Sequence, residues 1–102
     1  MSTLHTVNKS SFTHSTLKSC ISVCANNDGI LLLEDGVFSA LQSAPDAEAL
    51  ITLNEKGVVI YASQDDIKAR GLEHKIASHI QLTNYEGFVS LTLYHKCIQS
   101  WY

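Results

Sequence analysis

The sequence predicts an α/β domain of three layers, in which helices cover both faces of a mostly parallel sheet of about five strands. Short apolar runs of strand character alternate with longer stretches of helical periodicity along the whole chain. The run Ile30–Leu33 is apolar at every position, which is typical of a strand buried on both faces of a parallel sheet. The segments between predicted strands are long enough to hold the crossover helices that parallel strands require.

The first predicted strand, Thr3–Val7, is followed by a polar turn and then by a helix. Ser15 is placed to cap this helix at its N-terminus. The apolar positions of the helix recur at the spacing of one helical face. They are Leu17, Cys20, Ile21 and Cys24. Both cysteines therefore lie on the face that we expect to pack against the sheet.

Two helices are predicted between the second and third strands. Asp35 can cap the first, which ends before Pro45 because proline breaks a helix interior. The second covers residues 46–53. Gly57 then precedes the third strand, Val58–Ala62. Predicted strands and helices thus continue to alternate through the middle of the chain.

Two further helices are predicted in the last third of the chain. Ser63 and Asp66 resemble a capping box, which opens a helix over residues 64–70. Asn84 can cap the last helix. The two remaining strands are Ile80–Thr83 and Cys97–Trp101. The alternation predicts a parallel sheet with helices on both sides.

Length and charge limit the functions to consider. A chain of 102 residues is expected to form one domain over residues 1–102, with limited stability of its own, so that a partner would be useful. The formal net charge of −3 and the absence of a basic run argue against direct nucleic-acid binding. The sequence has neither a signal-peptide pattern nor an apolar run long enough to span a bilayer. We therefore expect a cytoplasmic protein that does not enter a membrane.

The three cysteines are expected to be reduced thiols, because their number is odd and no export signal precedes them. Cys20 and Cys24 are four residues apart, which is neither the CxxC redox motif nor a zinc-binding pattern. Burial in the core is the simplest interpretation of both, and above all of Cys24. A lowered pKa is conceivable for the Cys20 thiol, one turn into its helix, if the side chain reaches solvent. Cys97 is expected to be a solvated or interface thiol.

Other candidate sites lie after the carboxyl ends of the predicted strands, where open parallel sheets collect functional groups. The pair Glu34 and Asp35 could bind a metal or act as acid and base, but we interpret it as a helix cap with a favourable dipole contact. The five histidines are dispersed without metal-binding spacing, and no glycine-rich loop follows a strand. Trp101 and Tyr102 are expected to pack on the core or on a partner.

Five blocks of the sequence resemble DsrH/TusB proteins and come in the same order. They are Leu4–Ser10, Leu31–Val37, Tyr61–Ala62 with Asp66–Leu72, Tyr85–Val89 and Gln99–Trp101. The resemblance spans nearly the whole chain. It implies a DsrE-like α/β fold and a heterohexamer with two copies each of three homologous subunits, called DsrE, DsrF and DsrH or TusD, TusC and TusB.

The resemblance also implies a role in sulfur relay. The complex passes sulfur as a cysteine persulfide, and the principal persulfide cysteine belongs to the DsrE/TusD subunit, which hands sulfur to a DsrC or TusE acceptor. This chain would be a mainly architectural, non-autonomous subunit of that sulfurtransferase complex, without a cofactor. Cys20 aligns with a cysteine of DsrH-type members and is the one position to which a persulfide-carrying role transfers. Nothing carries over to Cys24 or Cys97.

Three functional hypotheses follow. The leading one is a subunit of a cytoplasmic sulfur relay, serving either dissimilatory sulfur oxidation or 2-thiolation of the tRNA wobble uridine. Cys20 and the N-terminal block slightly favour sulfur oxidation. The second is a purely structural subunit, with every sulfur step on its partners. The third is a free-standing ligand-binding α/β domain, against which the missing glycine-rich loop counts.

Overall fold

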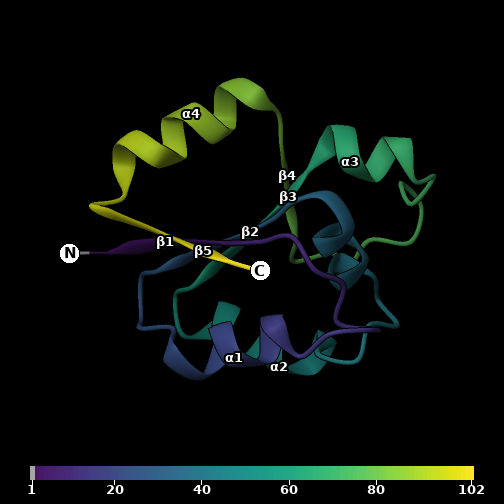
Figure 1. The fold of residues 1–102 in the computed structure, drawn as a ribbon, viewed down its shortest axis with the longest axis horizontal. Coiled ribbons are helices and arrows are strands. Elements are labelled where there is room, and N and C mark those ends of the chain that lie inside the picture. Colours follow the sequence, from purple (N-terminus) through teal and green to yellow (C-terminus); the bar gives the residue numbers. More distant parts are fainter. Residues whose placement is uncertain (1) are drawn as a thin grey trace.

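The structure, a computed structural model that describes residues 2–102, contains a sheet of five parallel strands in the order β4-β3-β2-β1-β5 (Figure 1). The strands are β1 (Thr3–Val7), β2 (Gly29–Leu32), β3 (Val59–Ser63), β4 (Gln81–Thr83) and β5 (Cys97–Trp101). Each observed strand agrees with its predicted range to within one residue at either end. The predicted α/β class and parallel sheet are therefore confirmed.

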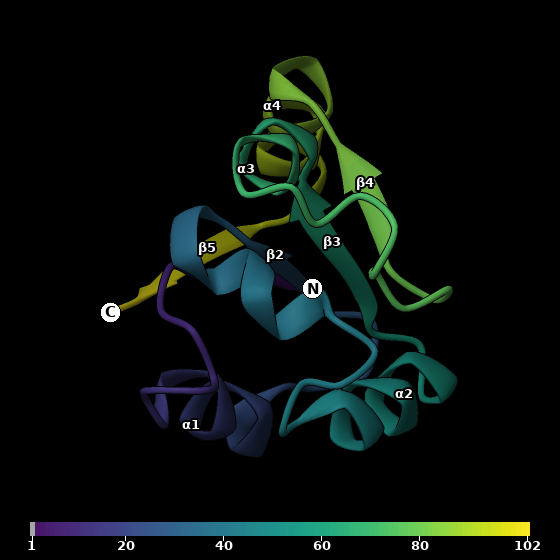
Figure 2. The same cartoon turned by 90° about the vertical axis from the view of Figure 1, so that its right-hand side faces the viewer.

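Helices lie on both faces of this sheet. They are α1 (Thr16–Val23), the 3₁₀ helix η1 (Glu34–Ala40), α2 (Ala47–Glu55), α3 (Gln64–Ala69) and α4 (Tyr85–Tyr94). In Figures 1 and 2, α1 and α2 cover one face, and α3 and α4 lie over the other. The three layers predicted from the sequence are thus present.

The core is densest between the sheet and the layer formed by α1 and α2. All four residues of β2 are buried, as the uninterrupted apolar run predicts. Leu17 and Cys20 are the buried residues of α1, and Leu50 is that of α2. These three side chains join a cluster with buried residues of β1, β2 and β3. The apolar face of α1 therefore packs as its periodicity predicts, with Cys20 inside.

The helix after β2 differs from its prediction. Residues 34–40 form a 3₁₀ helix whose N-cap is Leu33, so the predicted cap by Asp35 is wrong. Glu34 adopts a positive φ of 51°, and the chain then passes so close to β1 that a Cβ on Gly36 would collide with the carbonyl oxygen of Val7. The close approach of Gly36 to Val7 determines the backbone path of η1. Helical periodicity within the segment does not predict this contact.

The predicted caps of the later helices are present with one change. The Asn84 side chain accepts a hydrogen bond from the Gly87 amide at 2.9 Å, and the Ser63 hydroxyl accepts one from the Asp66 amide at 3.4 Å. The Asp66 carboxylate does not complete the capping box, because it accepts a hydrogen bond from the Glu34 amide at 2.9 Å instead. Asp66 thereby ties the start of η1 to α3.

Helix α4 covers its face of the sheet loosely. Every residue of this helix is at least partly exposed, and Tyr85, Leu93 and Tyr94 are exposed by 76%, 82% and 78%. Tyr85, Val89 and Leu93 are spaced four residues apart and form an apolar stripe along the helix. Apolar residues on such a stripe are normally covered. Within residues 2–102, no helix combines the length and the apolar character needed to cross a bilayer.

Candidate functional site

The two cysteines of the first helix form a close pair with unequal exposure. The Sγ atoms of Cys20 and Cys24 lie 4.0 Å apart, within the range of a weak S–H···S hydrogen bond. Cys20 is fully buried, as predicted for a core residue. Cys24, the C-cap of α1, packs against the core as expected but is only partly buried. Cys97 is exposed, as expected of a solvated thiol.

The structure places His5 of β1 beside this pair. One ring nitrogen of His5 and the two sulfurs all lie within 4.8 Å of one another. The imidazole itself is buried and held at both nitrogens. Nε2 lies 3.0 Å from the Asp28 carboxylate, and Nδ1 accepts a hydrogen bond from the Trp101 indole at 3.1 Å. Because an indole N–H only donates, the neutral ring carries its proton on Nε2 and donates it to Asp28.

Asp28 connects the start of the sheet to the end of α1. Besides the His5 ring, its carboxylate accepts hydrogen bonds from the backbone amides of Thr3 and Ala25, each at 3.0 Å. Burial raises the pKa of Asp28, but the hydrogen bonds from Ala25, Thr3 and His5 outweigh that effect and hold the pKa below its usual value. A buried carboxylate with three donors stays ionised at neutral pH.

The environment gives the two thiols opposite acidities. The hydrogen bond with Cys24, together with burial, raises the pKa of the Cys20 thiol far above its ordinary range. The hydrogen bond from Cys20 lowers the pKa of Cys24 to about 6, because it and the nearby His5 ring outweigh the opposing effects of burial and Asp28. Cys24 in turn favours the protonated His5 and raises its pKa. Burial favours Cys20 as the protonated member of the pair, and the more exposed Cys24 as the member that ionises first.

A histidine with two cysteines is also a soft-metal ligand set, but the hydrogen bonds of His5 do not suit one. A metal on Nε2 would displace the bond to Asp28 and leave a proton on Nδ1, facing the indole N–H of Trp101. A metal on Nδ1 would have to displace Trp101 itself. The orienting partner of a metal-bound histidine is an acceptor such as a carboxylate or carbonyl, and Trp101 cannot serve as one. The cluster is better described as a thiol pair beside an oriented histidine.

The acidic residues at the carboxyl edge of the sheet serve to join elements. The Arg70 guanidinium contacts Asp35 at 2.9 Å and Asp66 at 3.5 Å. These contacts link η1 to α3 at the surface of the protein. The titratable cluster around Cys24 lies elsewhere, where α1 ends and β2 begins. The candidate functional groups were expected after the carboxyl ends of the strands. The thiol pair does not lie there.

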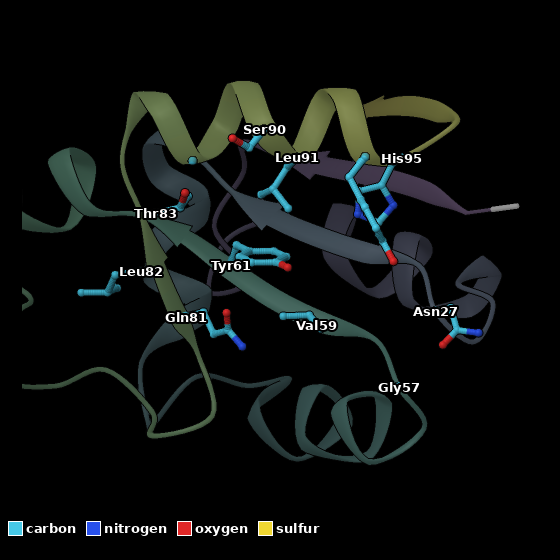
Figure 3. A pocket seen from close by; sticks show the side chains of 12 residues that line it. Asn27, Gly57, Val59, Tyr61, Gln81, Leu82, Thr83, Ser90, Leu91 and His95 are labelled. Carbon is cyan, nitrogen blue, oxygen red and sulfur yellow. The ribbon is translucent and has the colours of Figure 1, made fainter.

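A separate cavity of about 640 Å³ lies between α4 and the sheet (Figure 3). Its lining includes Tyr61 of β3, Thr83 of β4 and Leu91 of α4. His95 closes one end, with Nδ1 bonded to the Ser2 hydroxyl at 2.8 Å, and burial holds its pKa below the usual value. The lining is neutral at physiological pH. The cavity offers neutral hydrogen-bonding groups and apolar surface, without a charged side chain.

A family model described as DsrH like protein matches residues 9–98 of the chain. The chain belongs to the DsrH family. Proteins named TusB from Yersinia pestis and Yersinia pseudotuberculosis are each 36% identical over 98 residues, covering 96% of this chain and 99% of theirs. The resemblance identified from the five sequence blocks is therefore confirmed.

Solved structures share the α/β fold of this chain. The ychN protein from E. coli matches with a TM-score of 0.79 at 13% identity, over 98% of this chain and 99% of that one. Tm0979 from Thermotoga maritima matches with a TM-score of 0.63 at 26% identity, over 89% and 91%. These two structures share the fold over 98% and 89% of this chain.

Sequence reasoning identified Cys20 and Cys24 but missed the groups around them. His5 was one of five dispersed histidines, and Asp28 was part of the turn that ends the first helix. Trp101 stands at the other end of the chain. The parallel pairing of β1 with β2 and β5 brings these residues together. A histidine in the middle of a predicted strand, as His5 is, was the one local signal.

Proposed function

We propose that this DsrH-family chain is a non-autonomous subunit of a cytoplasmic sulfur relay complex. Family membership over nearly the full length is the observation that carries the proposal. In this role the chain supports the transfer of persulfide sulfur to a DsrC/TusE-type acceptor, while the principal persulfide cysteine belongs to a DsrE/TusD-like subunit.

The loose packing of α4 supports a role that depends on partners. The apolar stripe of Tyr85, Val89 and Leu93 is exposed, and the adjacent edge strand β5 leaves Ile98 half exposed. Apolar surface of this kind marks protein interfaces. We propose that homologous DsrE/TusD-like and DsrF/TusC-like subunits cover it in a heterohexamer.

Cys20 is the position to which the resemblance assigns a persulfide. Its thiol is fully buried and its pKa is raised, and both properties disfavour nucleophilic attack by Cys20. This observation favours the second candidate function, an interaction subunit in which Cys20 itself carries no sulfur.

The relay could feed sulfur oxidation or 2-thiolation of the tRNA wobble uridine. The matching relatives carry the name TusB, which supports the tRNA route, whereas Cys20 is the feature that favours the other. We place the tRNA route first. Deletion of the gene for this chain should lower the 2-thiouridine content of tRNA, measured by mass spectrometry of digested tRNA. An unchanged content would favour sulfur oxidation.

Reconstitution tests the proposed function. The two partner subunits are loaded with a persulfide donor, with and without this chain, and sulfur transfer to a DsrC/TusE-type acceptor is followed by intact-mass spectrometry. We expect transfer to fall when the chain is omitted. Equal transfer without the chain would contradict its membership of the relay. Cys20→Ser separates the two roles, because loss of transfer would make Cys20 a carrier and unchanged transfer would leave it structural.

A further inference from the structure

The end of helix α1 presents one thiol toward solvent and keeps a second directly behind it. Cys24 follows the last helical turn, where its amide bonds to the Ile21 carbonyl at 3.3 Å, and its side chain keeps partial exposure. Cys20 lies one turn earlier, inside the core, with its sulfur 4.0 Å from that of Cys24. A reagent can therefore approach the pair only from the Cys24 side.

The groups that face Cys24 come from three segments. Cys20 belongs to the same helix, His5 to β1, and Asp28 to the turn before β2. The Cys20 S–H and the His5 ring both favour a negative charge on the Cys24 sulfur, whereas Asp28 opposes it. Asp28 is nevertheless engaged by three hydrogen-bond donors, which draw its charge away from the sulfur.

We propose that Cys24 is the thiolate through which this chain takes up sulfane sulfur from a persulfide, and that Cys20 is a positioning thiol. The proposal rests on the proposed function for its substrate class, a cysteine or low-molecular-weight persulfide. It shifts the sulfur-carrying role from Cys20, which the resemblance indicated, to the neighbour whose sulfur a substrate can reach.

The uptake step is a displacement at sulfur without net oxidation. The Cys24 thiolate attacks the outer sulfur of the donor persulfide, and a new S–S bond forms between that sulfur and Cys24 Sγ. The original S–S bond of the donor breaks, and the donor leaves as a thiolate. The outer sulfur keeps its proton or loses it to solvent. A thiolate of the next acceptor removes the outer sulfur from Cys24 in the same way.

The buried thiol protects the persulfide as well as helping to form it. If Cys20 were a thiolate, it would attack Cys24 Sγ, release hydrosulfide and leave a Cys20–Cys24 disulfide, so that the sulfur would be lost to the relay. Burial of Cys20 keeps it protonated. A protonated thiol is a poor nucleophile, and it can still donate a hydrogen bond to the Cys24 sulfur.

The thiolate is tested first on the full-length chain, without any sulfur donor. The rate of alkylation by iodoacetamide is measured against pH, and peptide mapping separates the three cysteines. We expect Cys24 to titrate with a midpoint near pH 6, well below the 9.0 of an ordinary cysteine. Cys20→Ala should raise this midpoint, and Cys20→Ser, which keeps an O–H donor, should preserve most of the shift. An ordinary midpoint for Cys24, or equal midpoints in the two variants, would overturn the proposed pairing.

Sulfur uptake is tested with glutathione persulfide as the probe and intact-mass spectrometry as the readout. The wild type, Cys20→Ser and Cys97→Ser should each gain the mass of one sulfur atom at Cys24, and Cys24→Ser should gain none. Circular dichroism establishes that each variant is folded. Uptake that persists in Cys24→Ser, or that maps to Cys97, would refute the assignment of Cys24.

The two proposals fail in different ways. A complex that relays sulfur equally well with Cys24→Ser would leave the proposed function intact and remove the role of Cys24. A chain that loads sulfur on Cys24 but never affects transfer between the partners would keep the thiolate site and remove the relay function.

Discussion

At the scale of single residues, Asp28 organises the surroundings of the thiol pair. It holds the His5 ring, the first residue of β1 and the turn after α1 through hydrogen bonds of 3.0 Å. A buried acceptor shared by three donors is costly to replace, because every donor it loses is left without water as an alternative. The same carboxylate therefore serves stability and the electrostatics of Cys24.

Asp28→Asn should lower the free energy of unfolding by about 2–3 kcal/mol, because its amide group would face N–H donors on at least one side. Denaturant unfolding at pH 7 measures the change. Asp35→Asn is the matched control: its carboxylate pairs with Arg70 but is mostly exposed, and it should cost no more than about 0.5 kcal/mol. Equal costs for the two variants would contradict the role given to Asp28.

The stability that Asp28 provides should depend on pH in one direction. Because folding lowers its pKa, the contribution is complete above the ordinary value of 3.8 and disappears as the pH falls through the lower folded-state value. The free energies of unfolding of the wild type and Asp28→Asn should therefore approach each other as the pH falls below 3.8. A gap that stays constant down to pH 2 would show that folding does not lower the pKa of Asp28.

The sequence predicts the individual thiols but not their surroundings. The helical stripe identifies Cys20 and Cys24 as neighbours from local spacing alone. His5 and Trp101 are 96 positions apart in the chain and meet only because β1 and β5 pair in parallel. Periodicity describes one element at a time, whereas the acidity of Cys24 depends on contacts between elements.

At the scale of elements, the β-strands and α-helices follow their local patterns, and η1 departs from its pattern at a close backbone approach. Alternating apolar runs and capping residues are local signals, which explains the agreement over the sheet and over α1, α2, α3 and α4. The Gly36 approach to Val7 is a contact with another strand. The sequence pattern of residues 34–40 therefore does not predict this contact.

Gly36→Ala should destabilise the protein by about 3 kcal/mol or more, because the added methyl group would overlap the Val7 carbonyl of β1. Gly71→Ala is the control. Gly71 has a φ of 66° but open space around it, so its substitution should cost only about 1 kcal/mol. Thermal unfolding compares the two. A smaller effect at position 36 than at position 71 would contradict the packing of η1 on β1.

The two predicted caps that differ in hydrogen bonding allow a second comparison. Asn84→Ala should cost about 1 kcal/mol and speed amide hydrogen exchange in α4, since Asn84 accepts from the Gly87 amide. Ser15 occupies the same position at α1 without a side-chain capping bond among residues 2–102, so Ser15→Ala should have a clearly smaller effect. If Asn84→Ala speeds exchange in α4 no more than Ser15→Ala speeds it in α1, the Asn84 cap contributes little.

At the scale of the whole molecule, the exposed apolar stripe on α4 should matter for the proposed assembly and not for folding. Leu93 is 82% exposed, so Leu93→Glu should change the stability of the isolated chain by no more than about 0.5 kcal/mol. The same substitution should strongly weaken binding to the partner subunits, measured by co-purification. Ile51→Glu is the matched control, an exposed apolar residue of α2 on the opposite face, and it should bind normally. Equal binding by Leu93→Glu and the wild type would exclude α4 from the interface.

The central claim is that this DsrH-family chain works as a subunit of a larger complex, and native mass spectrometry tests it most directly. The chain is co-expressed with the proposed DsrE/TusD-like and DsrF/TusC-like partners and purified through a tag on one of them. We predict a complex with two copies of each of the three chains. A partner complex that assembles without this chain, together with a chain that stays monomeric, would contradict the claim.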